Sequence, residues 1–353
     1  MSSLAHRSMA ELSSLDLQES VAQVGFHWEA LRDGHVLVTG GTGFVGTWLL
    51  ESLLMANKVL KLGARAAVMT RDPARFRAKM PRMADQPCVR LFTADVTSGE
   101  FPHENFSHVI HAAADPTRSR SEHEQLRTFD TIVCGTRRIL DFSRSTGVPN
   151  LLFLSSGAVY GPQPQDVTLI TEDCLNAPPT DDPSWSYAEA KRAAELECAK
   201  YAAQSGMRIT IARCFALIGP HLPLDGPYAA GNFVRNAIRG EPITVRGDPS
   251  TVRAYLYAGD LAAWLWTMML NSKASGTYNV GSDHPITIAE LAELFASAGN
   301  VSVRIVETEG MRPSRYVPCI DRARTQLDLD VRVPLNEAIQ RTLRWYLQNS
   351  YNE

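Results

Sequence analysis

From residue 35 the chain reads His35-Val36-Leu37-Val38-Thr39-Gly40-Gly41-Thr42-Gly43-Phe44-Val45-Gly46, and the rest of the architecture can be worked out from this run. Its first half has the pattern of a buried strand, and apolar residues at helical spacing follow from Trp48 onward. Between the two, Gly40 can make a sharp turn, Gly43 lets the backbone approach a pyrophosphate, and Gly46 lets the helix pack closely. The N–H groups and the dipole of the helix start then face the anion. We therefore predict a dinucleotide-binding turn with contacts from Gly40, Thr42, Gly43, Phe44, Val45 and Gly46.

Short apolar runs alternate with longer amphipathic stretches on the C-terminal side of this turn. The pattern predicts strands at 35–39, 66–70, 89–93, 108–112, 150–155 and 207–212, and helices at 44–56, 123–146 and 187–205. Strand and helix in repeated alternation indicate an α/β fold with a Rossmann-type, doubly wound parallel sheet.

The alternation ends after Gly219-Pro220, where a Pro- and Gly-rich stretch begins. We predict three parts. An N-terminal extension covers 1–33, with a helix that packs Phe26 and Trp28 onto the main body. An NAD(P)-binding Rossmann domain that carries the catalytic residues covers 34–219. A smaller mixed α/β, substrate-binding lobe covers 220–353, and some of its segments return to the sheet. Ligands of open α/β sheets bind at the carboxyl ends of the strands, so this lobe would close over them.

The composition excludes several classes of function. The chain has 353 residues, 44% of them hydrophobic, and its net charge of −3 comes without a long run of one sign, which argues against a nucleic-acid partner. Its six cysteines lie far apart, so we expect free thiols in a reducing compartment and no metal site. The N-terminus lacks the apolar core of a secretion signal, and the longest apolar stretch, 261–270, is too short to cross a bilayer. We expect a soluble cytoplasmic protein without membrane contact.

A tyrosine and a lysine stand four residues apart in Tyr187-Ala188-Glu189-Ala190-Lys191, on one face of a predicted helix. Hydride transfer between a carbinol carbon and nicotinamide also moves a proton on the adjacent oxygen, and a free phenol, with a pKa of about 10, is a poor base near neutrality. A neighbouring ammonium stabilises the phenolate and lowers that pKa. Tyr187 is therefore our candidate acid–base group and Lys191 its partner, with both also contacting the cofactor.

Two hydroxyls, Ser155 and Ser156, follow the buried strand that begins at residue 150. A hydroxyl at the carboxyl edge of the sheet can donate to the substrate oxygen while Tyr187 exchanges its proton. The residues alone leave open which of the two serines does this. Tyr160 lies nearby but has no lysine four residues on, so we reject it as the catalytic tyrosine.

These motifs together resemble the extended short-chain dehydrogenase/reductases, often called the NAD-dependent epimerase/dehydratase family, over about residues 34–345. The resemblance rests on the Gly-x-x-Gly-x-x-Gly turn, the Tyr-x-x-x-Lys pair, the Ser-x-x-Val-Tyr-Gly segment ending at Gly161, and the segments 213–220 and 276–281. It selects Ser156, because the family's catalytic hydroxyl lies five residues before that glycine. It also implies a homodimer through a four-helix bundle of 123–146 and 187–205, and cofactor contacts from Asp95, Val96, Ala112, Ala113 and Ala114.

The choice of nicotinamide cofactor depends on the end of the second predicted strand. That strand ends in Thr70 rather than in an acidic residue that would accept hydrogen bonds from an adenosine ribose. Arg71 follows at once, and a guanidinium there can pair with a 2′-phosphate and stack on adenine, which favours NADP over NAD. In the alternative interpretation Arg71 is a solvated loop charge and Asp72 takes the ribose.

The resemblance further implies a nucleotide-sugar substrate. Arg253 and Arg312 match positions that clamp a diphosphate, since each guanidinium can give paired hydrogen bonds to phosphate oxygens. Ala216 stands where the family has an asparagine near the diphosphate, and Asn232 is our candidate for the missing amide. Ile132 replaces another family asparagine.

Dehydratases of the family carry acidic residues just after the catalytic hydroxyl, where this chain has Gly157 and Ala158. Without those carboxylates dehydration lacks its acid and base, which leaves reduction or epimerisation at sugar C4. The argument for NADP favours a 4-ketoreductase over a 4-epimerase, with base and sugar left open. Two alternatives are a cofactor-sensing regulator without catalysis, against which the Tyr187–Lys191 pair argues, and an enzyme for a small carbonyl compound, in which Arg253 and Arg312 would not converge on the cleft.

Overall fold

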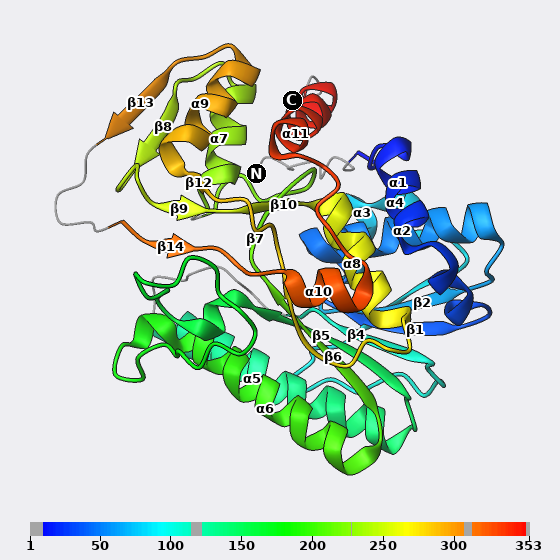
Figure 1. The fold of residues 1–353 in the computed structure, drawn as a ribbon. Helices are drawn as coiled ribbons and strands as arrows, with labels where there is room; N and C mark the ends of the chain where they lie inside the picture. The colour runs from blue at the N-terminus through cyan, green and yellow to red at the C-terminus, as the bar shows by residue number, and fades with distance from the viewer. Residues whose placement is uncertain (1–9, 114–121, 227, 307–312, 351–353) are drawn as a thin grey trace.

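The computed structural model describes residues 10–113, 122–226, 228–306 and 313–350 (Figure 1). Its centre is a parallel sheet with the strand order β11-β6-β5-β4-β1-β2-β3. The strands are β1 (His35–Thr39), β2 (Arg65–Thr70), β3 (Val89–Thr93), β4 (His108–His111), β5 (Asn150–Ser156), β6 (Arg208–Cys214) and β11 (Gly276–Val280). The predicted Rossmann-type fold is confirmed, and all six predicted strands are present.

Helices cover both faces of this sheet (Figure 1). Side chains of β1 alternate between the two layers, with Val36 and Val38 in one core cluster and Leu37 in another. On the first face lie α2 (Phe44–Leu60) and α8 (Ala258–Leu270); on the second, α5 (Glu122–Ser145) and α6 (Ser186–Ser205) run side by side. Every residue of α8 is buried, which explains its largely apolar sequence. Within the described ranges, each helix is too short or too polar to span a bilayer.

The N-terminal segment forms α1 (Ser14–Val24) and a 3-10 helix, η1 (Gly25–Leu31). Helix α1 packs against α2 and α8, the helices on the first face, and η1 packs against α8. Trp28 is fully buried, with its ring centroid 5.0 Å from that of Trp266. The expectation that Phe26 packs beside it is wrong, because Phe26 is 80% exposed. In a 3-10 helix, with three residues per turn, residues two apart point in different directions, so both rings cannot face the body.

The chain after β6 builds smaller sheets above the carboxyl edge of the large one (Figure 1). A pair, β8 (Ile243–Arg246) with β13 (Val303–Val306), packs with α7 (Ala229–Ile238) and α9 (Ile288–Gly299). A second group joins β12 (Ile286–Thr287), β9 (Val252–Arg253) and β14 (Arg315–Tyr316), and its register places Tyr316 opposite Arg253. The third pair is β7 (Ala216–Ile218) with β10 (Tyr255–Tyr257). The division at residue 219 stays a prediction, and β11 lies in the large sheet although it follows that point.

The remaining elements connect these layers. They are α3 (Pro73–Lys79), α4 (Pro81–Ala84), η2 (Gly157–Tyr160), η3 (Pro183–Trp185), α10 (Asp321–Leu327) and α11 (Leu335–Ser350). Helix α11 packs beside the N-terminal segment, where Arg341 pairs with Asp16 and the Trp345 indole donates to the Glu11 carbonyl at 2.8 Å.

Candidate active site

The turn after β1 has no space for side chains at two of its glycines. Gly40 has a φ of +71°, and a Cβ there would lie 2.5 Å from the Ala112 carbonyl oxygen. A Cβ on Gly46 would lie 2.4 Å from the Cα of Gly41, so α2 packs directly on the turn. Gly43 is the N-cap of α2 and brings no side-chain oxygen to the first helical N–H groups. A cradle of this kind fits the pyrophosphate of a dinucleotide.

The turn sits at the point where the strand order reverses, between β1 and β4, which is where open α/β sheets bind their ligands. The Thr39 hydroxyl lies 2.7 Å from Nδ1 of His111, and Thr136 lies 3.1 Å from Nε2 of the same ring. Burial lowers the pKa of His111 to about 3, so this imidazole is neutral. The Ala113 N–H also donates to the Thr39 hydroxyl, at 3.2 Å, which holds the second predicted cofactor loop against the first.

Other predicted cofactor contacts lie along the same edge. Arg71, which follows β2, is exposed, and its charge helps to lower the pKa of Asp95, behind the stronger effect of a hydrogen bond from Thr97. Val96 is buried against Gly135. Asp72, the alternative ribose ligand, accepts a hydrogen bond from the Arg75 N–H at 2.8 Å and so caps α3. The predicted contact Ala114 lies outside the described residues.

The three predicted catalytic residues come together at the carboxyl end of β5. Tyr187 and Lys191 occupy successive turns of α6, and Ser156 ends β5. Burial raises the pKa of Tyr187 above its usual range, while a side-chain hydrogen bond with Ser156 opposes that rise. Lys191 is 2% exposed and donates to the Leu154 carbonyl at 2.6 Å. Burial lowers its pKa to about 8. The arrangement can exchange a proton with a substrate oxygen that reaches Ser156 and Tyr187.

A second phenol, which our sequence analysis missed, completes this group. Burial raises the pKa of Tyr316, and a side-chain hydrogen bond with Ser156 opposes the rise. Its ring lies 4.5 Å from that of Phe215. Cys214 lies beside the site, and its electrostatic interaction with the two phenols raises the pKa of both Tyr187 and Tyr316. No spacing in the sequence links Tyr316 to Ser156, since only the pairing of two short strands, β14 with β9, brings it here.

The neighbouring Ser155 and the rejected Tyr160 belong to a separate polar cluster. Ser155 donates to Glu195, which also accepts from Arg213 at 2.6 Å. Arg213 donates to the Tyr160 hydroxyl at 2.7 Å, and Tyr160 donates to the Asn279 side-chain oxygen at 2.8 Å. Both Ser155 and Tyr160 are buried among these partners.

The predicted substrate residues have different positions. Arg253 lies next to the site, with its guanidinium carbon 5.9 Å from the centre of the Tyr316 ring and hydrogen bonds to the Ser314 carbonyl and hydroxyl. Asn232 lies on α7 and donates to the Gly226 carbonyl at 3.3 Å. Its N–H bonds the carbonyl of Tyr228, whose phenol also raises the pKa of Tyr187. Arg312 lies outside the described residues.

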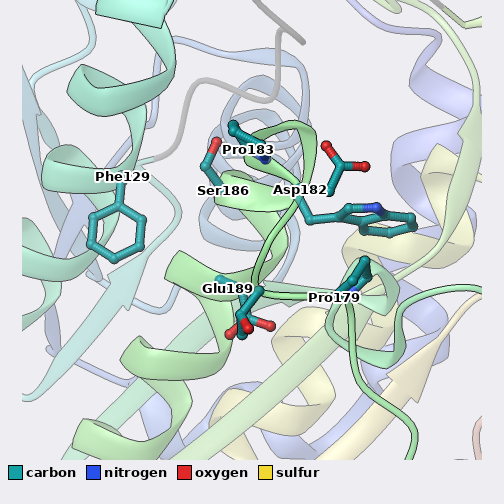
Figure 2. Close-up of a pocket in the computed structure, with 8 residues that line it drawn as sticks. Phe129, Pro179, Asp182, Pro183, Ser186 and Glu189 are labelled. Atoms are coloured by element: carbon teal, nitrogen blue, oxygen red, sulfur yellow. The ribbon is translucent and has the colours of Figure 1, made fainter.

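A pocket of about 310 Å³ opens beside the start of α6 (Figure 2). Phe129 of α5 faces it from one side, and Asp182, Pro183, Ser186 and Glu189 line the other. Ser186 directly precedes Tyr187, so the pocket adjoins the helix start that carries the acid–base candidate, yet its lining includes none of the predicted site residues. The hydroxyl contacts around Ser156 mark the candidate site better than this pocket does.

Comparison with known proteins agrees with this arrangement. The model of the NAD dependent epimerase/dehydratase family matches residues 36–281, well over half of the chain. The chain belongs to this family. A UDP-glucuronic acid decarboxylase 1 from Danio rerio is 28% identical over 313 residues, which cover 88% of this chain and 72% of the relative. The expected nicotinamide dinucleotide cofactor is confirmed at the level of the family, and the choice of NADP stays a prediction.

Two solved structures of similar chains hold NAD. A dTDP-glucose 4,6-dehydratase from Streptomyces venezuelae is 25% identical, with a TM-score of 0.77 over 90% of this chain and 98% of that one. A UDP-glucose 4-epimerase from Thermus thermophilus is also 25% identical, with a TM-score of 0.71 over 88% of this chain and 98% of that one. These similarities support a shared overall fold.

Proposed function

We propose that this chain transfers a hydride between NAD(P) and carbon C4 of a nucleotide-diphosphate sugar, working as a 4-ketoreductase. The observation that carries the proposal is the meeting of Ser156 and Tyr187 at the same sheet edge as a turn in which Gly40 and Gly46 leave no space for a side chain. The family membership, and the nucleotide sugars named for the similar proteins, support this class of substrate. The glycine turn and the Ser156–Tyr187 pair adjoin the same edge of the sheet. One bound ligand can therefore reach both.

The protonation states fit the reducing direction. When bound, NAD(P) supplies the hydride. Tyr187 gives a proton to the carbonyl oxygen of the sugar, and burial keeps its pKa high enough for the phenol to start protonated. Ser156 donates a hydrogen bond to the same oxygen. Lys191, with a pKa of about 8, is mostly protonated at neutral pH and supplies a positive charge one helical turn from the phenolate that forms.

The preference for a reductase over a 4-epimerase depends on Arg71. Its exposed guanidinium near Asp95 is available to a 2′-phosphate, whereas an oxygen of Asp72 already caps α3. A reductase exchanges its cofactor at every turnover, which suits NADPH. We expect Arg71→Ser to lower kcat/KM for NADPH about tenfold, the effect of roughly one charge-assisted hydrogen bond, and to leave NADH almost unaffected. Arg75→Ser, on exposed α3, is the matched control.

Decarboxylation of a nucleotide-linked uronic acid is the second candidate, and the identity with the UDP-glucuronic acid decarboxylase favours it. Oxidation at C4 would turn the sugar into a β-keto acid, which loses CO₂ before the hydride returns. That reaction would use Ser156 and Tyr187 in the same way but leave no net change in the cofactor. Epimerisation at C4 would likewise leave no net change in the oxidation state of the cofactor.

One substrate panel separates these reactions. Wild-type protein is incubated with UDP-, dTDP-, GDP- and CDP-linked 4-keto sugars, their reduced forms and UDP-glucuronic acid, and NADPH absorbance and product NMR are followed. Stoichiometric oxidation of NADPH supports the reductase. Inversion or loss of CO₂ without net oxidation identifies an epimerase or a decarboxylase. Cofactor binding without any turnover would overturn the proposal and favour a cofactor sensor.

We also propose a homodimer, formed through α5 and α6, in a reducing, cytoplasmic compartment. Leu126 on α5 is 62% exposed and Leu196 on α6 is 59% exposed, so both helices carry apolar side chains that a four-helix bundle would cover. All six cysteines are free thiols, which suits such a compartment. Light scattering should give a dimer mass, and Leu126→Glu combined with Leu196→Glu should give a monomer. A wild-type monomer would contradict the dimer.

A further inference from the structure

His111, the last residue of β4, is a buried polar side chain that the proposed reaction does not use. The parallel register of β4 with β1 sets it beside Thr39, the last residue of β1. Side chains that are paired in register on neighbouring strands point to the same face of a sheet. For these two residues it is the face that α5 covers, and Thr136 of α5 reaches the same ring. All three side chains are 1% exposed.

The two ring nitrogens of His111 contact hydroxyls from two different elements. Nδ1 lies 2.7 Å from the Thr39 hydroxyl, and Nε2 lies 3.1 Å from the Thr136 hydroxyl. A neutral imidazole has one donor nitrogen and one acceptor nitrogen, so the ring uses both of its hydrogen-bonding groups. A hydroxyl that is bonded to a fixed ring cannot rotate freely. His111 therefore sets the direction in which Thr39 accepts its other hydrogen bond, from the Ala113 N–H at 3.2 Å.

Three of the predicted cofactor segments meet around this ring. Thr39 directly precedes the glycine turn, and Ala113 lies in the loop that follows β4. Helix α5, which carries Thr136, also holds the third segment, because Arg138 donates to the Val96 carbonyl at 2.9 Å. The imidazole thus links the end of β1 to the helix that supports the neighbouring cofactor segment.

The glycine turn and the loop after β4 are packed without spare space. A Cβ on Gly40 would lie 2.5 Å from the Ala112 carbonyl oxygen, so the two segments are already in contact. A ligand bound at the point where the strand order reverses has to fit between such loops. Loops that are held in the binding geometry lower the cost of ordering them when the ligand binds. A shift of the Thr39 hydroxyl would therefore be felt at the cofactor site.

From this geometry we propose that His111 is a positioning residue for the dinucleotide, which fixes the Thr39 hydroxyl and, through it, the spacing between the glycine turn and the loop after β4. The inference rests on the cofactor part of the proposed function and does not depend on the sugar. His111 acts through Thr39, because its own ring is enclosed between β1, α5 and the Phe153 ring of β5, whose centroid is 5.7 Å away.

Two carboxamide variants separate the two contacts of the ring. The amide of an asparagine lies about as far along the side chain as Nδ1 of a histidine, and the amide of a glutamine about as far as Nε2. His111→Asn should keep the contact with Thr39 and bind NADPH and NADH as tightly as wild type. His111→Gln should keep only the contact with Thr136, and its Kd for both cofactors should rise about tenfold, the size expected for one lost buried hydrogen bond. Fluorescence titration of each cofactor, without sugar, measures these constants.

His108, the first residue of β4, provides the matched control. It is also a buried histidine, 4% exposed, and its Nδ1 lies 2.8 Å from the Ser107 hydroxyl at the opposite end of the strand. His108→Gln should lower the melting temperature as His111→Gln does but leave both cofactor constants unchanged. If His111→Gln does not fold, Thr39→Val removes the same contact from its other end, and its Kd should rise in the same way.

The outcomes separate this inference from the proposed function. Wild-type protein that binds neither NADPH nor NADH refutes the cofactor part of the proposed function. Tight binding by wild type and an unchanged Kd in His111→Gln, or in Thr39→Val where that variant replaces it, refute only the inference. Equal weakening by His108→Gln or by His111→Asn also overturns it, since the loss would then come from the packing of β4 and not from the contact with Thr39.

Discussion

Two adjacent serines at the end of β5 enter two different environments. Ser155 belongs to what we call the structural cluster, Ser155, Glu195, Arg213, Tyr160 and Asn279, which is linked by hydrogen bonds and by the Arg213–Glu195 ion pair. Ser156 belongs to the site cluster, Ser156, Tyr187, Lys191 and Tyr316. Neighbouring side chains on a strand point to opposite faces, so one residue step separates the two clusters.

The clusters differ in how their polar groups are compensated. In the structural cluster the Arg213 guanidinium, whose side chain is 16% exposed, is paired with the Glu195 carboxylate and bonded to Tyr160. In the site cluster the buried Lys191 ammonium bonds to a carbonyl oxygen, and burial lowers its pKa. The first cluster should therefore contribute to stability, while the second should cost stability and supply reactivity, as is typical of functional sites.

The largest expected effect contrasts the tyrosines of the two clusters, Tyr187 and Tyr160. Tyr187→Phe should lower turnover by about 10³-fold or more, since general acid–base catalysis is worth about 10²–10⁴ in rate, and should leave cofactor affinity unchanged. Tyr160→Phe should keep turnover within a few-fold and lower the melting temperature, because Arg213 and Asn279 lose a partner. Steady-state kinetics and thermal melts of both variants check this. Equal kinetic loss in the two would remove the distinction between the clusters.

Removal of the carboxylate from the structural cluster comes next. Glu195→Ala leaves the mostly enclosed Arg213 guanidinium without its ion-pair partner, so we expect the free energy of unfolding to fall by about 3 kcal/mol. Urea denaturation gives the value, and Glu189→Ala, on the same helix with a side chain that is 28% exposed, is the control. A loss below about 1 kcal/mol would mean that the structural cluster is not what holds β5 against α6.

The site cluster should lower the stability of the protein, because Lys191 holds a buried charge without a carboxylate partner among the described residues. Burial lowers the pKa of Lys191 from an ordinary 10.5 to about 8. Below about pH 8 the folded and unfolded states both hold the proton, and the cost of the buried charge is fully present. Between about pH 8 and 10.5 only the unfolded state holds it, so stability rises with pH.

Lys191→Met should therefore stabilise the protein at pH 7 by about 2 kcal/mol, after about 1 kcal/mol is subtracted for the lost bond to Leu154, while abolishing activity. Its stability should no longer rise between pH 8 and 10.5. Chemical denaturation at several pH values measures this. A Lys191→Met variant less stable than wild type at pH 7 would show that the lysine contributes to the fold instead.

The smallest effect concerns the serines themselves. Ser155→Ala should cost about 1 kcal/mol of unfolding free energy, because Glu195 loses a hydrogen bond, and should leave turnover near the wild-type level. Ser156→Ala should change stability by less than that but lower kcat. Paired denaturation and kinetic measurements distinguish the two, and exchanged phenotypes would place the reaction on the other face of β5.

The parts of this molecule that were predictable from sequence are the local ones. The glycine turn, the strands around it and the Tyr187–Lys191 pair follow from spacing within a few residues, because turn geometry and helical periodicity act at that range. The choice of Ser156 over Ser155 came from the family resemblance. Trp28 was placed correctly on the body and Phe26 was not, since the 3-10 geometry of η1 turns them apart.

The other features of the site depend on contacts between residues that are far apart in the sequence. Tyr316 reaches Ser156 only because β14 pairs with β9, and two strands of two residues leave no readable periodicity. The structural cluster likewise joins residues from β5, β6, α6, β11 and η2, whose contacts depend on how the sheet assembles. Catalytic roles of the site cluster stay predictions that the experiments above address.

The central claim is that a hydride reaches sugar C4 beside Ser156 and Tyr187, and isotope transfer tests it most directly. NADPH dideuterated at the nicotinamide C4 is incubated with the best 4-keto sugar nucleotide of the panel, and the product is analysed by NMR and mass spectrometry. We predict one deuterium at sugar C4 with wild-type protein and with Tyr160→Phe, and no labelled product with Tyr187→Phe. Label at another carbon, an unlabelled reduced sugar, or full labelling by Tyr187→Phe would each contradict the claim.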